Sequence, residues 1–455
     1  MHTLEQLRDG SLAGAVRLRL SCGLTEFPPE IFDLADTLEI LDLSGNALSR
    51  LPDALPRLTR LRILFCSSND FTVLPAMLGA CPQLTMIGFK SNRIKEVPAT
   101  ALPAALRWLI LTDNRITALP ASIGRCTQLQ KLMLAGNELR ALPEALAACT
   151  ALELLRIAAN ALTTLPAWLL AMPRLAWLAY AGNPCSAADE AAARAGAQPA
   201  PIDWQQLQLA QRLGEGASGV IYQGQWRQAG SAAADAVRAV AVKLFKGAIT
   251  SDGLPACELA ACIGAGGHPH LIAVLGEVTG HPAGAQGLVM DLIDPAFHNL
   301  AGPPSMDSCT RDIYRPGQRF TLATLLRLAG AVAAAAAHLH SRGILHGDLY
   351  GHNILHTDDG EALLGDFGAA SQFACQGAQA GALQRLEVRA FGVLLGELIE
   401  RCEGAPGTDD VIEPLAQLRQ DCVQDKAAAR PLFEDIARRI AQADQAWQLR
   451  ICSCR

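Results

Sequence analysis

The segment His346-Gly347-Asp348-Leu349-Tyr350-Gly351-His352-Asn353-Ile354-Leu355, with Asp366-Phe367-Gly368 shortly after it, decides how the C-terminal half of this chain folds. It places an aspartate five residues before an asparagine and adds a second aspartate at a turn after a strand. Phosphoryl transfer from ATP needs such a set, because one carboxylate must orient the acceptor hydroxyl while hard oxygen ligands hold Mg2+ against the phosphates. The spacing predicts a phosphotransfer site with Asp348 as the orienting base and Asn353 and Asp366 as metal ligands.

A glycine-rich stretch and a lysine-bearing strand precede this segment. The stretch runs from Leu213 to Tyr222 and contains Gly214, Gly216, Gly219 and Val220. Glycines let backbone amides approach phosphates closely, although a tight hairpin needs glycines as well. Farther on, the apolar strand Val240-Ala241-Val242 ends in Lys243. A lysine there is costly unless an opposite charge meets it, so Lys243 is a candidate for a paired functional charge.

Together these motifs resemble those of eukaryotic-like protein kinases over about residues 205–445. The resemblance implies an α+β bilobal domain that binds ATP and Mg2+. It assigns Lys243 to the ATP phosphates and to Glu258, the only acidic residue in the helical stretch 254–263. It also implies an adenine site beside the hinge between the lobes, formed by Val220, Ala241, Met290, Asp291 and Leu355.

Two departures from the kinase pattern lie in the catalytic loop. Gly347 replaces the arginine that usually receives a phosphorylated activation loop. Without that receptor we expect activity that does not depend on loop phosphorylation, for example at Ser371. Tyr350 stands where serine/threonine kinases usually carry a lysine near the γ-phosphate, so one positive charge is missing.

Two further departures bear on which molecule accepts the phosphate. The segment from Asp366 to Glu387 is short and lacks Ala-Pro-Glu, so the usual peptide platform is truncated and Arg430 needs another partner. Glu387 begins a helix that resembles the anchor of the catalytic loop, in a place usually filled by aspartate. His-Gly-Asp with a later asparagine also resembles the catalytic loop of aminoglycoside and choline phosphotransferases. Two alternatives therefore stay open: a weakly active kinase-like scaffold, and a phosphotransferase for a small molecule.

The N-terminal part carries an internal repeat. From Leu38 onward Leu-x-x-Leu-x-Leu-x-x-Asn-x-Leu recurs with a later Leu-Pro, at a spacing of 22 or 23 residues. The pattern resembles leucine-rich repeats, in which each unit buries its apolar side only by stacking on its neighbours. The asparagines follow each strand, where a side-chain amide satisfies backbone groups of the adjacent coil. They are Asn46, Asn69, Asn92, Asn114, Asn137, Asn160 and Asn183.

Outward strand positions of the repeats form the predicted concave face. They are largely apolar where solvent is normally met, which indicates a surface for a protein partner, a substrate or the second domain. An ordinary surface with scattered apolar side chains is the alternative. The candidate contact residues are Ile63, Phe65, Met86, Trp108, Ile110, Met133 and Trp177.

Composition narrows the class of protein. The net charge of −6 and the pI near 5.9 supply no basic stripe for nucleic acid and no polybasic membrane patch. The first residues lack the layout of a signal peptide, and the Ala-rich run at 329–337 is too short to span a bilayer. We therefore expect a cytoplasmic protein without a membrane span; export to another cell stays open. The repeated cysteines Cys81, Cys126 and Cys149 are expected as buried thiols.

The sequence thus predicts an α/β leucine-rich-repeat solenoid followed by an α+β bilobal protein-kinase-like domain. The expected boundaries are 1–200 for the repeats with terminal caps, 201–445 for the kinase-like domain and 446–455 for a tail. The N-lobe is expected over about 205–293 and the C-lobe over about 294–445. The leading hypothesis is an ATP-dependent protein kinase, most simply for serine and threonine, in which the repeats bind a protein.

Overall fold

The computed structural model describes residues 2–196, 199–216, 218–228, 237–246, 249–403 and 409–453 of the 455-residue chain. Its contacts divide the chain into two units. Unit 1 comprises Met1–Leu175 and Asn183–Cys185, and unit 2 comprises Ala176–Gly182 and Ser186–Arg455. Residues 176–182 continue the repeat pattern in the sequence, yet by their contacts they belong to the unit that carries the phosphotransfer motifs.

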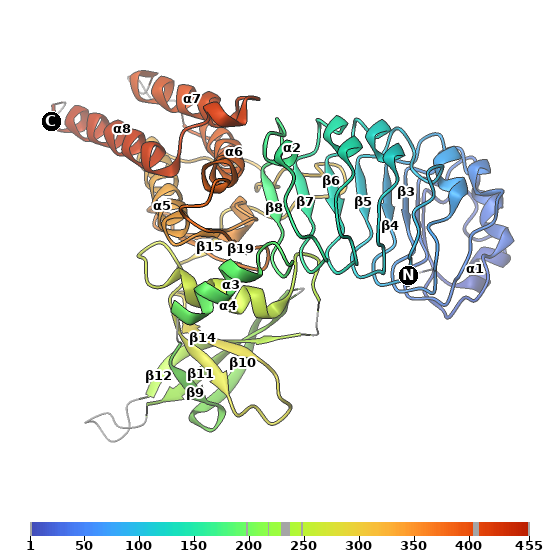
Figure 1. Cartoon of the computed structure of the whole chain (residues 1–455), viewed down its shortest axis with the longest axis horizontal. Helices are drawn as coiled ribbons and strands as arrows, with labels where there is room; N and C mark the ends of the chain where they lie inside the picture. The colour runs from blue at the N-terminus through green and yellow to red at the C-terminus, as the bar shows by residue number, and fades with distance from the viewer. Residues whose placement is uncertain are drawn as a thin grey trace. The chain divides into compact units, whose positions relative to one another are not determined.

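Unit 1 is a stack of short parallel strands taken in chain order (Figure 1). Each strand has three residues, and its middle residue is an aliphatic side chain that is at most 1% exposed. Since one such strand buries almost nothing alone, the stack of repeats supplies the core, as the repeat pattern predicts. The strands are β1 (Arg17–Arg19), β2 (Ile40–Asp42), β3 (Ile63–Phe65), β4 (Met86–Gly88), β5 (Trp108–Ile110), β6 (Lys131–Met133) and β7 (Leu154–Arg156).

The repeated asparagines connect neighbouring turns of unit 1. The Oδ1 atom of Asn137 accepts the Ile116 N–H at 3.0 Å, and its Nδ2 atom donates to the carbonyls of Leu111 and Leu134, each at 2.9 Å. Asn69, Asn114 and Asn160 make equivalent bonds in other repeats. Both ends of each amide are used, which confirms the expected role of these residues.

Short helical turns form the other side of the stack. Prolines stand at the N-cap of most of these turns, where their fixed φ suits the start of a helix. Cys81, Cys126 and Cys149 are buried at the ends of three turns, and their thiols donate to backbone carbonyls, as expected. The turns are α1 (Leu4–Arg8), η1 (Pro29–Leu34), η2 (Leu55–Arg57), η3 (Ala76–Ala80), η4 (Ala121–Arg125), η5 (Glu144–Ala148) and α2 (Ala167–Leu170).

The apolar face of the repeat strands is only partly open. Ile63 and Met86 are 5% and 4% exposed, so the expectation that both are available to a partner is wrong. Side chains along the face pack on one another. The Phe65 ring lies over Gly88, and the Trp108 indole N–H points to the Met133 sulfur at 3.4 Å. The half-buried candidates that remain are Phe65, Trp108, Ile110 and Met133.

Trp177 corrects the sequence prediction most clearly. It lies on β8 (Trp177–Ala179), is 1% exposed, and belongs to unit 2. The stretch after the last repeat, expected as a cap within the repeat domain 1–200, forms α3 (Ala187–Gly196), which packs against α4 (Pro255–Ala265) in unit 2. Both segments therefore contribute to the second unit.

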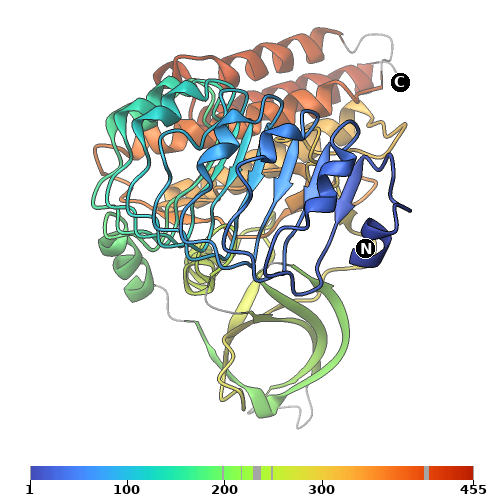
Figure 2. The ribbon, with the colours of Figure 1, turned by 90° about the vertical axis from the view of Figure 1, so that its right-hand side faces the viewer.

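The first part of unit 2 is a curved six-stranded sheet in the order β10-β11-β12-β14-β13-β9 (Figure 2). The pairs are antiparallel except that β9 joins β13 in parallel. Ile202, Val240, Val242, Val278 and Val289 form its core. The strands are β9 (Pro201–Asp203), β10 (Leu207–Glu215), β11 (Gly219–Arg227), β12 (Val237–Phe245), β13 (Val274–Thr279) and β14 (Gly287–Asp291), with the turn η6 (Trp204–Gln206) after β9.

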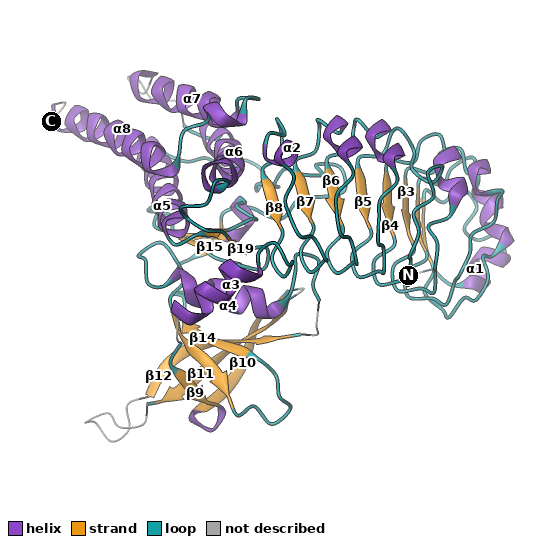
Figure 3. Ribbon diagram, viewed as in Figure 1, coloured by secondary structure: helices purple, strands orange, loops and turns teal. Residues whose placement is uncertain are grey.

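The second part of unit 2 is mainly helical (Figure 3). Its long helices are α5 (Leu322–Ser341), α6 (Ala380–Ile399), α7 (Asp409–Val423) and α8 (Phe433–Ser453). Short strands flank the catalytic motifs. One small sheet consists of β15 (His298–Asn299), β17 (Ile354–His356) and β18 (Ala362–Leu364). A second consists of β16 (Ile344–Leu345) and β19 (Ser371–Gln372). The turns η7 (Gly351–Asn353) and η8 (Ala427–Ala429) complete the unit, which has the predicted α+β bilobal fold.

Helices α5 and α8 bear on two further expectations. Helix α5 is the one described helix that is long and apolar enough to cross a bilayer, but it is mostly buried within unit 2 and packs against α8. Burial of this kind is typical of a core helix in a globular domain. The segment expected as a tail from residue 446 continues α8 as far as Ser453, and the last two residues lie outside the described part.

Candidate active site

Lys243 and Glu258 form an ion pair between β12 and α4. The side chains are 11% and 3% exposed, and the Lys243 ammonium contacts the Glu258 carboxylate directly. The other carboxylate oxygen of Glu258 has no hydrogen-bond partner among the described residues. It lies 3.7 Å from the place of a Cβ added to Gly368, so the pair reaches the Asp-Phe-Gly segment.

The electrostatics keep the Lys243 ammonium charged. Burial alone lowers the pKa of Lys243, but the carboxylates of Glu258 and Asp366 outweigh burial and raise it above its usual value. Burial raises the pKa of Glu258, the Lys243 charge opposes that effect, and Asp366 adds to it. A protonated lysine is thus held in a buried place close to two carboxylates, where a phosphate can share its charge.

The glycine-rich hairpin joins β10 to β11. A Cβ added to Gly219 would lie 2.5 Å from the Leu244 carbonyl oxygen, so the pairing of β11 with β12 itself requires this glycine. Gly214 and Gly216 differ, because an added Cβ would meet nothing within 4 Å. Packing of the described residues gives no reason for glycine at these two positions, which suits the close approach of a ligand to the backbone.

The residues expected around adenine come from both lobes. Ala241 pairs with Met290 between β12 and β14, and Ala241 is 6% exposed. Val220 and Leu355 are half-buried on β11 and β17. The Asp291 side chain is engaged by Arg238, which leaves the backbone of Asp291 as its possible contribution to a nucleotide site.

The catalytic-loop residues are held together by one amide. Asn353 Nδ2 donates to the Asp348 carboxylate and to the Asp348 backbone carbonyl, both at 2.8 Å. The backbone N–H of Gly365 donates to the Asn353 carbonyl at 2.9 Å, which brings the residue before Asp366 next to Asn353. The structure therefore groups Asp348, Asn353 and Asp366 although 18 residues separate the first from the last.

Glu387 on α6 anchors the start of the catalytic loop. Its carboxylate accepts the N–H groups of His346 and Gly347 at 3.2 and 2.6 Å, and the His340 ring lies 2.7 Å away. Burial alone raises the pKa of Glu387, but the histidines and the backbone donors lower it below its usual value. The expectation that this helix anchors the loop is confirmed by these bonds.

The donor set suits Mg2+ only together with phosphates. No group of three or more His, Cys, Asp or Glu side chains in the described residues is arranged as a metal site by itself. Mg2+ commonly takes one or two protein oxygens and completes its shell with phosphates and water. Because Asn353 Nδ2 is committed to Asp348, its Oδ1 atom is the one left for a cation, and Asp366 supplies a carboxylate. The residues present therefore fit the ion.

Asp312 and His352 form a polar contact beside the catalytic loop that no sequence motif predicts. Asp312 accepts the His352 backbone N–H at 3.0 Å and lies 2.7 Å from the His352 ring nitrogen Nδ1. Nε2 of His352 is 3.9 Å from Asp348 Oδ2. Burial lowers the pKa of His352, but Asp312 outweighs that effect and raises it. In the sequence Asp312 is a single acidic residue outside every motif, so this contact could not be predicted from it.

Arg430 has found partners other than a glutamate. It is 1% exposed, and its guanidinium donates to the backbone carbonyls of Gln424 and Arg385 at 3.0 and 3.1 Å. Burial lowers the pKa of Arg430 to about 10. The arginine is thus kept as a structural element of the C-lobe even though the Ala-Pro-Glu motif is missing.

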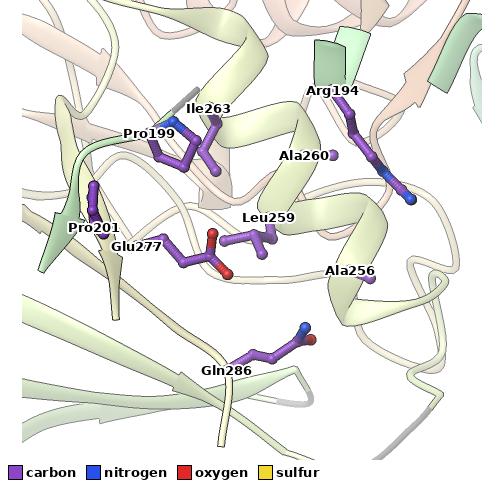
Figure 4. A pocket seen from close by; sticks show the side chains of 9 residues that line it. All are labelled: Arg194, Pro199, Pro201, Ala256, Leu259, Ala260, Ile263, Glu277 and Gln286. Atoms are coloured by element: carbon purple, nitrogen blue, oxygen red, sulfur yellow. The ribbon is translucent and has the colours of Figure 1, made fainter. Parts of the chain in front are cut away.

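The outer face of α4 lines a separate hollow (Figure 4). Its volume is about 520 Å³, and none of the proposed catalytic residues lines it. Apolar side chains at helical spacing face Glu277 and Gln286 across it. The lining residues are Arg194, Pro199, Pro201, Ala256, Leu259, Ala260, Ile263, Glu277 and Gln286.

Comparison with protein families agrees with this geometry. Residues 207–389 match the family described as protein tyrosine and serine/threonine kinase. Residues 37–58 and 104–162 match leucine-rich-repeat families. The kinase match covers the glycine-rich hairpin, Lys243, Glu258 and the catalytic loop.

Curated relatives are similar over parts of the chain. A probable serine/threonine-protein kinase of Arabidopsis thaliana is 30% identical over 104 residues, which is 23% of this chain and 13% of the relative. The serine/threonine-protein kinase PITSLRE of Drosophila melanogaster is 28% identical over 171 residues, 37% of this chain and 16% of that protein. A probable cyclin-dependent kinase 10 of Dictyostelium discoideum is 29% identical over 164 residues, 35% of this chain and 40% of the relative. The chain thus spans less than half the length of these relatives, and it carries a protein kinase domain with leucine-rich repeats in its N-terminal part.

Proposed function

We propose that this chain is an ATP-dependent protein kinase that transfers the γ-phosphate to serine or threonine hydroxyls. The observation that supports this most strongly is the buried Lys243–Glu258 pair with Asp366 close enough to raise the lysine pKa, since protein kinases use such a lysine–glutamate pair and a metal-binding aspartate to hold ATP. The same proposal places the protein where ATP is available, in the cytoplasm.

Each site residue has a role in this proposal. Lys243 binds the phosphates of ATP, and Glu258 keeps its ammonium in place. Gly214 and Gly216 admit the phosphates to backbone amides of the hairpin. Asp348 accepts a hydrogen bond from the acceptor hydroxyl and orients its oxygen toward the phosphorus.

Asn353 and Asp366 would hold Mg2+, which neutralises the charge of the transferring phosphate when it is bound. Val220, Ala241, Met290 and Leu355 would enclose the adenine, with the backbone of Asp291 at its edge. Asn353 also keeps the Asp348 carboxylate turned toward the acceptor, because its Nδ2 atom holds one of the two carboxylate oxygens.

The test is phosphate transfer by the full-length protein with labelled ATP and Mg2+. We expect label on the protein itself or on an added protein, and a loss of about 100-fold or more in Asp348→Asn, which keeps size and polarity. Lys243→Arg should bind ATP more weakly because a guanidinium does not match the place of the ammonium. Transfer that is equal in wild type and Asp348→Asn would contradict the proposal, and label on small metabolites alone would favour the small-molecule reading.

We also propose that the repeats bind a protein partner or substrate through the half-buried part of the concave face. The supporting observation is the packed row of Phe65, Trp108 and Met133 on a repeat scaffold. Phe65→Glu with Trp108→Glu should lower the labelling of other proteins while leaving ATP hydrolysis by the same variant unchanged. Unchanged labelling would contradict this role. A variant at Arg93, whose ion pair with Asp70 is exposed, is the matched control.

A further inference from the structure

Two backbone segments occupy the place of a side chain before Asp348. Gly347 has a φ of +73°, and a Cβ added there would lie 2.4 Å from the Ala369 carbonyl oxygen and 2.9 Å from that of Leu178. Such distances exclude every residue except glycine, whose backbone also tolerates this conformation. An arginine that receives phosphate is therefore replaced by close packing against residues 176–182.

Trp177 holds the residues that follow Asp348. Its indole N–H donates to the Leu349 carbonyl at 3.0 Å, and its ring stacks on Tyr350 with centroids 4.2 Å apart and planes 6° from parallel. Stacked aromatic pairs contribute about 0.5–1.5 kcal/mol beyond the area they bury. Tyr350, which stands in place of the usual lysine, is thus a packing partner of Trp177.

Tyr180 and Ala181 hold the activation segment. Their N–H groups donate to the Ser371 hydroxyl at 3.0 and 3.2 Å, and the Tyr180 hydroxyl donates to the Gln372 carbonyl at 2.9 Å. Ser371 and Gln372 are 1% and 5% exposed, and they pair with the strand that leads directly into His346. The activation segment is therefore fixed from the same short stretch that fixes the catalytic loop.

Helix α3 continues this stretch and packs beside α4, the helix that carries Glu258 (Figure 1). The Glu190 carboxylate accepts the Gly182 N–H at 2.7 Å and the Ser186 hydroxyl at 2.6 Å, and the Cys257 thiol of α4 lies 3.8 Å from it. Asp189 accepts the Ala374 N–H at 3.1 Å, just after the activation strand. The start of α3 is therefore bonded to both α4 and the activation segment.

We propose that residues 176–182 and 186–196, here called the brace, position the catalytic loop, the activation segment and α4 for phosphoryl transfer, with Trp177 and Tyr180 as positioning residues. The brace does by permanent contacts what loop phosphorylation does through an arginine elsewhere. This inference rests on the proposed function, because positioning matters only if transfer occurs. It also explains why the Lys243–Glu258 pair and the Asp348–Asn353 bond are formed together in one structure.

The contacts of the brace make Ser371 inaccessible to phosphorylation. Its hydroxyl is buried and accepts two backbone N–H groups, so a kinase has no access to it and a phosphate has no room. Ser371→Ala would remove an acceptor from two buried donors and lower activity for structural reasons. That substitution is therefore a poor test of phosphorylation, and treatment of the wild type with a phosphatase is the better one.

The experiment compares full-length Trp177→Ala, Trp177→Phe and Tyr180→Phe with the wild type in labelled-ATP transfer. We expect Trp177→Ala to lower kcat by about tenfold or more, because small misplacements of reacting groups are costly. The KM for ATP should stay unchanged in these variants, since Trp177 and Tyr180 contact the catalytic loop and the activation segment and not the residues proposed to bind ATP. Trp177→Phe keeps the stack and loses one hydrogen bond, so it should recover most of kcat. Phosphatase-treated wild type should remain fully active.

A second measurement separates positioning from general damage. Amide hydrogen exchange of the full-length variants should rise in peptides 344–349 and 369–374, while the repeats of unit 1 exchange as in the wild type. Wild-type kcat or higher in both Trp177→Ala and Tyr180→Phe, with Asp348-dependent transfer intact, would overturn the brace and leave the proposed function standing. Absence of Asp348-dependent transfer in the wild type would overturn the proposed function, and the positioning role would fall with it.

Discussion

The asparagine turns of unit 1 and the active site of unit 2 satisfy their buried polar groups in different ways. In unit 1 each buried asparagine binds neutral backbone groups, and the same bonds recur from repeat to repeat. In the active site of unit 2 a buried pair of opposite charges, Lys243–Glu258, joins two distant elements, and the buried Glu387 carboxylate is held by backbone N–H groups and the His340 ring. A repeated neutral bond can be lost at one place without disturbing the others, whereas loss of one partner in a buried ion pair leaves the other charge unpaired. The comparison predicts that single substitutions act most severely in unit 2.

Glu387→Ala should have the largest effect. It removes a buried carboxylate that accepts two backbone N–H groups of the catalytic loop and contacts His340, so we expect a loss of about 3–5 kcal/mol in the free energy of unfolding of unit 2. Urea unfolding of the full chain, followed by hydrogen exchange in α6, measures this loss. Glu387→Gln keeps the size and one acceptor oxygen, and should lose clearly less. Equal stability of wild type and Glu387→Ala would break the contrast between the units.

Asn137→Ala tests the neutral side of the comparison. It leaves the Ile116 N–H without its buried partner, at about 1–3 kcal/mol. The carbonyls of Leu111 and Leu134 each lose one donor but keep a second one from another asparagine of the repeats. We expect a loss of about 2 kcal/mol, confined to unit 1 and without effect on phosphate transfer. Asn46→Ala is the control, because the bonds of this amide to the backbone are exposed or only partly buried, so water can replace part of them. Losses of equal size in both variants would show that burial does not set the cost.

The same contrast explains what the sequence could predict. The asparagine bonds of unit 1 join residues about one repeat apart, so a single period in the sequence revealed the whole scaffold. Lys243, Glu258, Asp348, Asn353 and Asp366 were found because known motifs carry them. The stack of Trp177 on Tyr350 joins residues far apart in the chain, and Trp177 was assigned to the concave face because it occupies a repeat position. Nothing in a local pattern indicates which side of a repeat strand another element will cover.

Glycine substitutions in the hairpin sharpen the comparison at the nucleotide site. Gly219→Ala puts a Cβ 2.5 Å from the Leu244 carbonyl oxygen, so we expect a loss of about 2 kcal/mol in the stability of unit 2. Gly216→Ala meets nothing within 4 Å and should leave the unfolding midpoint unchanged. It should instead raise the KM for ATP several-fold, because the added methyl group stands where the phosphates approach. Thermal unfolding and the ATP dependence of transfer separate the two effects, and a destabilised Gly216→Ala would contradict the ligand role.

Glu397 should give the smallest effect, and a pH-dependent one. Burial and the charge of Asp312 raise its pKa from 4.5 to about 7, against the hydrogen bond from the Tyr314 hydroxyl. The folded state therefore binds a proton more tightly than the unfolded state, so the wild type loses stability as pH rises from about 4.5 to about 7 and changes little above that. One pKa unit corresponds to about 1.4 kcal/mol, which sets an upper limit of about 3 kcal/mol for the loss of stability. Partial solvation of the carboxyl reduces the expected loss to about 1 kcal/mol.

Glu397→Gln keeps an acceptor for the Tyr314 hydroxyl and removes the titrating carboxyl. The variant should match the wild type at pH 4.5 and exceed it at pH 8 in urea unfolding, because only the wild type must ionise a buried carboxyl there. Parallel pH profiles of the two proteins would show that Glu397 ionises in the folded state at no cost in stability, and would contradict the expected penalty.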